Sequence, residues 1–424
     1  DQELEPAALF KPLIQSLTVD DRSDRNVAED EFLQDSIRLQ SLKGTPEYEQ
    51  FSGILQMKYG SSERYAGLLE KADAWIHQEF GTVDKTAAAS LFADTDRLSV
   101  TSLESYNQCP FRFFMQRGVK AKDPKTFEET SADRGSFLHA VLSECLPIAV
   151  RNGLRSQDTE ALRSLLEETA SRLLTTHNRR ILESGGLMEY EKTALLQAAA
   201  ESLDLVMKQG DSSEFKPEWL EYSIGDRHGF PMTLPDGRRF YLTGIADRAD
   251  VWTASDGTRY GRVIDYKSGR DRKALNRDTI ESGLKLQPPL YLHALSQEKN
   301  LQPAGMYYDR LKTEVLKLKA DQSPASSLLD EKRRSTRQMT GYTLADPKVL
   351  EASDTGYDPD SPGLFVSGSI PLSTTTKGAP KAACARSLVS SEEMSELIAL
   401  AVTKCQETIA AIQEGDMKAD PQKD

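Results

Sequence analysis

The apolar positions of this chain recur at two different spacings, and the spacing changes near residue 210. Before that point, apolar residues repeat at helical intervals and predict two long helices, 158–183 and 188–209. After it, apolar and polar residues alternate, as is typical of strands with one buried face. Strands are predicted over 219–224, 230–234, 239–252, 260–267 and 304–310, with a helix at 287–295 before the last of them. This order of elements predicts an α/β sandwich.

Two short turn sequences join the predicted central strands. Pro235-Asp-Gly237 separates the strands at 230–234 and 239–252. Asp256-Gly257 separates 239–252 from 260–267, and Asp-Gly between apolar β-formers is the strongest short-range signal for a hairpin. The segment 239–267 is therefore predicted to fold back on itself as a hairpin.

The remaining segments differ in composition from this centre. Residues 1–97 are polar, lean toward helix and contain no chemical motif. Residues 321–387 are rich in Ser, Pro and Thr and predict a long loop with little regular structure. A final helix is predicted over 390–414, because the capping box Ser390-x-x-Glu393 opens it and Gly415 follows it.

The predicted hairpin contains two acids and a lysine. Asp247 and Asp265 are expected to lie near each other across it, one on each strand. Because strand side chains alternate, Asp265 and Lys267 project from one face and Tyr266 from the other. Carboxylates are ligands that Mg²⁺ prefers, and a nearby amine can hold or deprotonate a metal-bound water. The hairpin therefore predicts a metal site suited to phosphodiester hydrolysis.

The Asp-x-Lys triplet is weak evidence alone, since 28% of the residues are charged. The same Asp-x-Lys pattern occurs at Asp123-Pro-Lys125 and Asp346-Pro-Lys348, but each of these contains a proline and lies in a polar connection. The hairpin differs from them because three further segments with useful side chains occur around it in a fixed order.

Two of these segments are predicted helices. Arg134-Gly-Ser-Phe-Leu-His139 opens a helix that presents an imidazole. Gln287-Pro-Pro has prolines where a first helical turn tolerates them, and it places Gln287 and Tyr291 on one face. For His139 and for the Gln287–Tyr291 pair, ordinary packing is the alternative interpretation.

The third segment begins with the capping-box pattern Thr101-x-x-Glu104 and ends in Cys109-Pro-Phe-x-Phe-Phe. The chain then shows, in order, Cys-Pro-Phe-x-Phe-Phe, Arg-Gly-x-x-x-His, Gly-x-x-Asp-Arg, Asp-Tyr-Lys and Gln-x-x-x-Tyr. This order resembles the RecB-type branch of the PD-(D/E)xK nucleases, and within that branch the nuclease domain of AddB subunits of bacterial AddAB helicase-nucleases. The resemblance runs from about residue 98 to the end of the chain.

The resemblance implies a fold and a domain division. The fold would be α/β, a restriction-endonuclease-like core with a central mixed sheet flanked by helices, and with helical additions. Residues 98–424 would form the nuclease domain, with its core at about 130–312. Residues 1–97 would be the tail of an upstream helicase-like region.

The resemblance also implies residue roles. The metal, Mg²⁺ or Mn²⁺, would be bound by His139, Asp247, Asp265 and the backbone carbonyl of Tyr266. Lys267 would orient the attacking water and stabilise charge on the scissile phosphate, leaving a 5′-phosphate and a 3′-hydroxyl. DNA contact or support of the site is expected from Gln287, Tyr291, Arg134, Arg248, Arg270, Arg272 and Lys273.

The cysteines depart from the family pattern. AddB-type nucleases hold a 4Fe–4S cluster with one cysteine in the Cys-Pro-Phe segment and three in a C-terminal run. Cys109 matches the first, whereas Cys145, Cys384 and Cys405 are scattered and are expected to be ordinary buried thiols. The chain is interpreted as a fragment ending before the run, with the cluster expected only in the full-length protein. The alternative is a lineage without the cluster, in which Cys109 packs among phenylalanines.

Composition sets outer limits. With 424 residues, 38% of them hydrophobic, the chain can bury a large core in two or three units. No apolar run approaches the ~20 residues of a membrane span, and no signal peptide opens the chain. With four unpatterned cysteines, these features predict a cytoplasmic protein without a membrane contact.

The formal net charge of −13 argues against nucleic acid as a partner, but local cationic surface decides such affinity. Cations cluster after the predicted hairpin and form a candidate DNA path: Arg262, Lys267, Arg270, Arg272, Lys273 and Arg277. The alternative for this stripe is a solvated, charge-rich loop.

The expected function is that of a Mg²⁺-dependent exodeoxyribonuclease acting on a single strand or an unwound duplex end during double-strand-break resection. Because the chain has no phosphate-binding Gly-x-x-x-x-Gly-Lys-Ser/Thr loop, a motor must be a partner. The resemblance implies an AddA-type helicase-nuclease subunit in a heterodimer. A DNA-binding scaffold that does not cut and a phosphodiesterase acting on small nucleotides remain the alternatives.

Overall fold

The computed structural model describes residues 32, 34–36, 38–39, 42, 47–59, 83–93, 95–121, 131–176, 186–267, 274–311, 334–335, 337–361 and 363–422. The chain divides into two compact units, residues 1–82 and 83–424. In the first unit, helix α3 (Glu47–Tyr59) buries Tyr48, Leu55 and Tyr59 in a small apolar cluster. The second unit includes helix α5 (Lys85–Phe92).

A six-stranded sheet forms the centre of the second unit, in the order β2-β5-β6-β7-β8-β9. Neighbouring strands are antiparallel except for the pairs β6–β7 and β8–β9, which are parallel. The sheet is thus mixed, and the predicted α/β class is confirmed. The strands are β2 (Lys216–Ser223), β5 (Ile245–Thr253), β6 (Arg259–Lys267), β7 (Gln302–Arg310), β8 (Thr340–Leu344) and β9 (Leu388–Val389).

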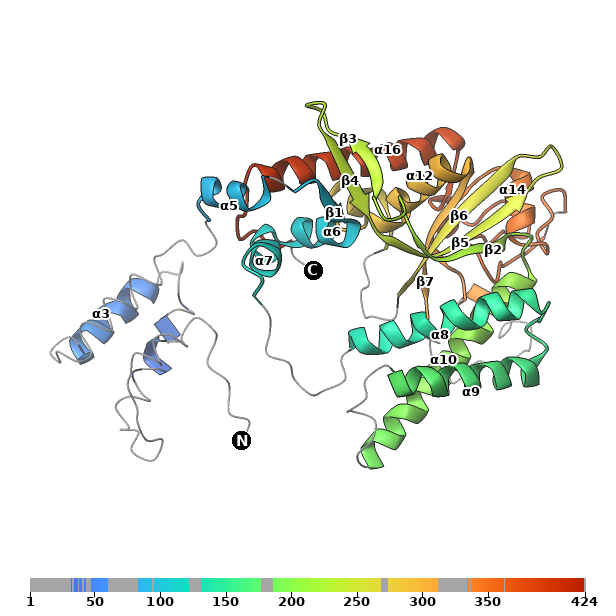
Figure 1. Ribbon diagram of the computed structural model, residues 1–424, viewed down its shortest axis with the longest axis horizontal. Coiled ribbons are helices and arrows are strands. Elements are labelled where there is room, and N and C mark those ends of the chain that lie inside the picture. The colour runs from blue at the N-terminus through green and yellow to red at the C-terminus, as the bar shows by residue number, and fades with distance from the viewer. Residues whose placement is uncertain are drawn as a thin grey trace. The chain divides into compact units, whose positions relative to one another are not determined.

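Helices cover both faces of this sheet (Figure 1). Because side chains alternate along β6, Val263 enters one apolar cluster, whereas Ile264 and Tyr266 enter the other. The first cluster packs against α6 (Val100–Gln108), α12 (Gln287–Lys299) and α16 (Ser391–Gln413). The second packs against α8 (Ser131–Arg151), α9 (Thr159–Thr176) and α10 (Gly186–Asp211). None of the helices in the described ranges is long and apolar enough to cross a membrane.

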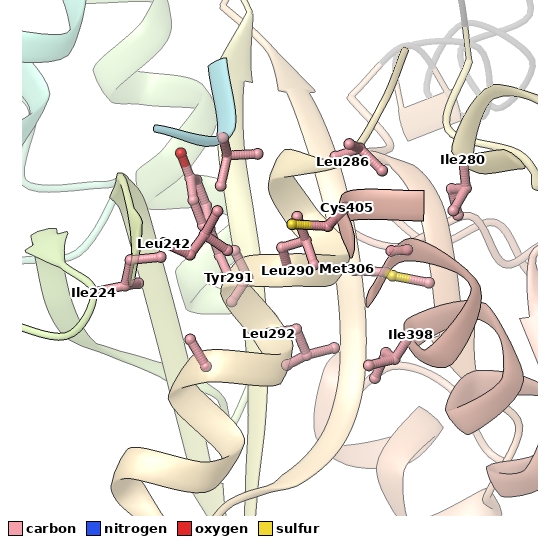
Figure 2. Close-up of a cluster of buried hydrophobic side chains, with 14 of the residues drawn as sticks. Ile224, Leu242, Ile280, Leu286, Leu290, Tyr291, Leu292, Met306, Ile398 and Cys405 are labelled. Atoms are coloured by element: carbon pink, nitrogen blue, oxygen red, sulfur yellow. The ribbon is translucent and has the colours of Figure 1, made fainter. Parts of the chain in front are cut away.

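A smaller sheet lies beside the main one, in the order β1-β4-β3. Its strands are β1 (Arg97–Ser99), β3 (Phe230–Thr233) and β4 (Arg239–Thr243). The sequence predicted one strand over 239–252, and this was wrong: the chain leaves β4 at Gly244 and enters the main sheet as β5. The Tyr291 ring fills the space at this break, because a Cβ on Gly244 would lie 2.5 Å from Tyr291 Cε1. Figure 2 shows Tyr291 from α12 beside Leu242 from β4.

Two other predictions about regular structure need correction. In the span predicted as a long loop, the described part contains β8, α14 (Pro347–Ser353) and α15 (Ala382–Ala385). Strand β8 exists because it pairs with β7, a contact that local composition does not reveal. The capping box predicted at Thr101 is also wrong, because the side chain of Ser99 caps α6 by accepting from Ser102 N. The capping box of Ser390 and Glu393 at α16 is confirmed.

A buried ion cluster lies on the strands β5 and β6. Arg248 donates from Nε and Nη2 to the two carboxylate oxygens of Asp250, each at 2.6 Å, and Arg262 Nε donates to Asp250 Oδ2 at 3.0 Å. All three side chains are at most 1% exposed. Arg262 was expected in a cationic surface stripe, and its burial corrects this. Arg248 was expected to contact DNA or to support the site; because it is buried, it can only support the site from inside the sheet.

Gly244→Ala is expected to lower the free energy of unfolding by about 1–3 kcal/mol, because the added methyl must displace the buried Tyr291 ring. Urea denaturation of the purified protein measures the change. Gly210→Ala in α10 is the control, because a Cβ there meets nothing within 4 Å and alanine favours helix. Equal stability of Gly244→Ala and the wild type would contradict the steric role of this glycine.

Candidate metal centre

The end of the β5–β6 hairpin brings the two predicted acids together. Arg248 pairs with Ile264 in the register of these strands, and Asp247 and Asp265 are the next residues beyond that pair, near enough for the Asp247 charge to act on Asp265. Asp247 Oδ2 accepts the backbone N–H of Tyr266 at 2.6 Å, which fixes its carboxylate against the neighbouring strand. Asp265 Oδ2 lies 2.5 Å from Lys267 Nζ. The predicted hairpin and the shared face of Asp265 and Lys267 are confirmed.

His139 reaches the same point from helix α8. Its Nδ1 lies 3.4 Å from Asp247 Oδ1, and its Nε2 lies 3.1 Å from the backbone oxygen of Tyr266. The ring also stands edge-on to the Tyr266 ring, with 5.7 Å between centroids. The imidazole is therefore held between a carboxylate and a carbonyl, both of which were predicted metal ligands.

Glu221 is a further acid at this site that was not predicted from the sequence. One ligand atom from each of His139, Glu221 and Asp247 can be chosen so that all lie within 4.8 Å of one another. The register of β2 against β5 pairs Leu220 with Arg248, which places Glu221 beside Asp247. Glu221 also has a positive φ of 48°. No local motif marks this residue, because its position depends on strand pairing.

Burial and like charge raise the pKa values of Asp265 and Glu221. Burial raises the pKa of Asp265 to about 7, and the Asp247 charge adds to this while Lys267 opposes it. Burial and the Asp247 charge likewise raise the pKa of Glu221. Burial alone would lower the pKa of His139, but the hydrogen bond and charge of Asp247 raise it above the ordinary value. The site thus has more negative groups than neighbouring cations can neutralise.

This donor set fits a hard divalent cation. Carboxylates and a backbone carbonyl suit Mg²⁺ or Mn²⁺, and one imidazole is compatible with the latter in particular. The excess of carboxylates supplies the charge that would attract such an ion. His139, Asp247 and Glu221 could therefore hold the metal together, with the Tyr266 carbonyl next to His139. Asp265, the other predicted ligand, contacts Lys267 and does not belong to this group of converging ligand atoms.

A second set of contacts connects Lys267 to helices α12 and α6. Lys267 Nζ donates to Gln287 Oε1 at 3.3 Å and lies 4.9 Å from the centre of the Tyr308 ring. Gln287 Nε2 in turn donates to Glu104 Oε2 at 2.6 Å. Burial raises the pKa of Glu104, and its hydrogen bonds and the Lys267 charge lower it in part. The sequence pattern assigned Glu104 to the cap of its own helix, so its place here was not predicted.

The remaining predicted residues lie in different environments. Tyr291 is 2% exposed beneath Gly244, so it supports the break between β4 and β5. Arg134 is exposed near the start of α8, and Arg277 is exposed at the start of α11 (Arg277–Glu281). Three predicted DNA contacts lie outside the described residues: Arg270, Arg272 and Lys273.

The cysteines do not gather into a cluster site. Cys145, Cys384 and Cys405 are buried thiols in separate elements, as predicted, and Cys109 is partly buried before α7 (Pro110–Phe113). Within the described ranges, no metal-ligand group includes a cysteine. The four cysteines present therefore do not fit an iron–sulfur cluster.

The chain is similar to proteins of a known family. Residues 97–424 match the family model described as the PD-(D/E)XK nuclease superfamily. A Clostridium perfringens protein, named as one subunit of an ATP-dependent helicase/deoxyribonuclease, is 31% identical over 301 residues, which cover 67% of this chain and 25% of that protein. The protein of the same name from Moorella thermoacetica is 29% identical over 371 residues, covering 85% and 31%. The chain thus spans about a quarter to a third of the length of these relatives.

Affinity for Mn²⁺ or Mg²⁺ is expected to fall as the pH drops below about 7, because ligands must lose their protons to bind a metal. The carboxyl of Asp265, with its pKa raised to about 7, and the imidazole of His139, with a raised pKa, keep their protons there. Calorimetric titration at about pH 6 and about pH 8 measures the change. Asp256→Asn, in the exposed turn of the same hairpin, should keep the wild-type profile. The same affinity at both pH values would contradict the assignment of these ligands.

Proposed function

Because the chain belongs to the PD-(D/E)XK nuclease superfamily, we propose that it is a metal-dependent deoxyribonuclease domain that cuts a DNA strand. The observation that carries this proposal is the convergence of His139, Asp247 and the Tyr266 carbonyl with the Asp265–Lys267 pair. These groups come from one helix and two adjacent strands, so the fold itself holds them together.

The metal would be Mg²⁺ or Mn²⁺, held by His139, Asp247, Asp265 and the Tyr266 carbonyl. When bound, such an ion supplies Lewis acidity and lowers the pKa of water. Glu221 adds a carboxylate beside this set and increases the charge that favours a divalent ion.

Lys267 would act as a fixed cation next to the scissile phosphate. Burial would lower its pKa, but the charge and hydrogen bond of Asp265 raise it, so the side chain keeps its proton near neutral pH. A charged ammonium is suited to hold the attacking water by its oxygen and to stabilise negative charge on the phosphate. It is not suited to remove a proton from water. The products would be a 5′-phosphate and a 3′-hydroxyl.

The DNA strand would pass residues exposed around this site. Arg134 lies on the same helix as His139 and is exposed, so it is the first candidate for a phosphate contact. Arg270, Arg272 and Lys273 follow β6 directly in the sequence and remain proposed contacts. Gln287 would act through Lys267, whereas Tyr291 and Arg248 are buried and would support the site without touching DNA.

The cellular setting is proposed from the names of the relatives, which describe one part of an ATP-dependent helicase/deoxyribonuclease. The partner would be an AddA-type helicase-nuclease subunit that unwinds DNA ends for exonucleolytic resection in the cytoplasm. A 4Fe–4S cluster would belong to the full-length protein. In support of this, Phe111 N donates to Lys418 O at 3.1 Å, so the C-terminal part of the described chain lies close to Cys109.

Asp265→Ala is expected to reduce cleavage of end-labelled single-stranded DNA by at least about 100-fold, because it removes a metal ligand and the partner of Lys267. The fold should persist, since the change relieves repulsion with Asp247 and the cost of a buried carboxylate. Assays with Mg²⁺ and Mn²⁺, together with thermal melting, measure both effects. Asp204→Ala, which removes a carboxylate from the surface of helix α10, is the matched control and should cut at the wild-type rate. If Asp265→Ala cuts as fast as the wild type, the site assignment is wrong.

A further inference from the structure

Glu104 makes a contact between distant parts of the chain that no motif accounts for. Its Oε1 accepts the backbone N–H groups of Leu286 and Gln287 at 2.6 and 3.0 Å. These N–H groups lie at the start of α12, where no side chain of the Leu286 N-cap makes a capping bond. The Glu104 carboxylate from α6 therefore caps α12 across more than 180 residues of sequence.

The second oxygen of Glu104 does something different. Oε2 accepts from the side-chain Nε2 of Gln287 at 2.6 Å. A side-chain amide has a donor nitrogen on one side and an acceptor oxygen on the other. Because a carboxylate only accepts, Gln287 must turn its NH₂ group toward Glu104. Its oxygen is then left to face Lys267 Nζ, 3.3 Å away.

Lys267 is thereby held on two sides. Asp265 Oδ2 lies 2.5 Å from its ammonium nitrogen, and Gln287 Oε1 accepts from the same nitrogen. If the Gln287 amide turned over, its NH₂ group would face the ammonium, and two donors would oppose each other. The orientation of this one amide decides whether Lys267 has a second acceptor.

We propose that Glu104 is a positioning residue of the catalytic site: it fixes the Gln287 amide so that its oxygen holds the Lys267 ammonium in place. The inference rests on the proposed function in one respect, namely that Lys267 acts in strand cleavage. It assigns to α6 a role at the site in addition to packing. Oε1 of Glu104 accepts the two capping bonds, and Oε2 accepts the bond that orients the Gln287 amide. Substitutions that change only one of these oxygens can therefore separate the structural role from the positioning role.

Glu104→Gln keeps one carbonyl-type oxygen for the two backbone N–H groups but presents an NH₂ group to Gln287. The Gln287 amide must then turn over, and kcat for DNA cleavage is expected to fall about 10- to 100-fold with little change in KM. Gln287→Glu places two carboxylates together and should also lower kcat. In the double variant Glu104→Gln/Gln287→Glu, the new amide can donate to the new carboxylate, which again accepts from Lys267.

The double variant is expected to recover at least about tenfold in kcat over each single variant, a coupling that a simple cap would not produce. Absence of recovery in a folded double variant would overturn the proposal. If Glu104→Gln alone fails to fold, comparing Gln287→Glu with the double variant still gives the test. Glu393→Gln is the matched control, because Glu393 also accepts a backbone N–H, from Ser390, but at α16 away from Lys267, and its activity should be unchanged.

A second measurement does not depend on nuclease activity. Glu104→Ala should increase the hydrogen-exchange rates of the Leu286 and Gln287 backbone amides, since both lose their acceptor. Unchanged exchange at these amides would overturn the proposed contact even in an active enzyme. If exchange increases but the wild-type protein cuts no DNA with Mg²⁺ or Mn²⁺, the contact stands and the proposed function fails.

Discussion

The pairing of β5 with β6 is the constraint on which the rest of this structure depends. Its register places Asp247 opposite Asp265 at one end and, through alternation, sends Arg248 and Arg262 to the other face. A shift of one residue would exchange these faces and would move the acids away from His139. The Asp256-Gly257 turn fixes that register, so a local signal determines the geometry of the whole site.

The buried charges on the two faces of this hairpin differ in how well they are compensated. On one face, Arg248 and Arg262 bond Asp250 directly, so the buried charges largely compensate one another. On the other, the Glu221 and Asp247 carboxylates lie close together, and the Asp247 charge adds to burial in raising the pKa of Asp265 to about 7 although Lys267 opposes it. The first arrangement stabilises the sheet from within. In the second arrangement the carboxylates repel one another, and a bound divalent cation would reduce that repulsion. Uncompensated charge of this kind is typical of a binding site, whereas a structural ion pair compensates its own charges.

The Glu104 contact shows how distant segments are joined at this site. Helix α6 provides the carboxylate, α12 provides Gln287, and β6 provides Lys267. The same helix holds the C-terminal segment, because Tyr106 donates from its hydroxyl to Asp416 O at 2.6 Å. Helix α6, which ends just before Cys109, therefore contacts the C-terminal segment through Tyr106. Through Glu104 and Gln287 it is also connected to the Lys267 ammonium. A displacement of α6 would move Glu104 and, through Gln287, would reach Lys267 at the candidate metal centre.

The sequence by itself determined the hairpin, the alternation that groups Asp265 with Lys267, the cap of α16 and the α/β class, because these follow from turn residues and from the spacing of apolar positions. The motifs Arg-Gly-x-x-x-His and Gln-x-x-x-Tyr also identified His139 and Gln287 as candidate site residues. Only the tertiary structure decided the places of Glu221 and Glu104, the burial of Arg248 and the break at Gly244. Each of these depends on which element lies next to which: a strand register, a helix start more than 180 residues away, or a ring that fills the space of a side chain. Such contacts leave no periodic or local pattern along the chain.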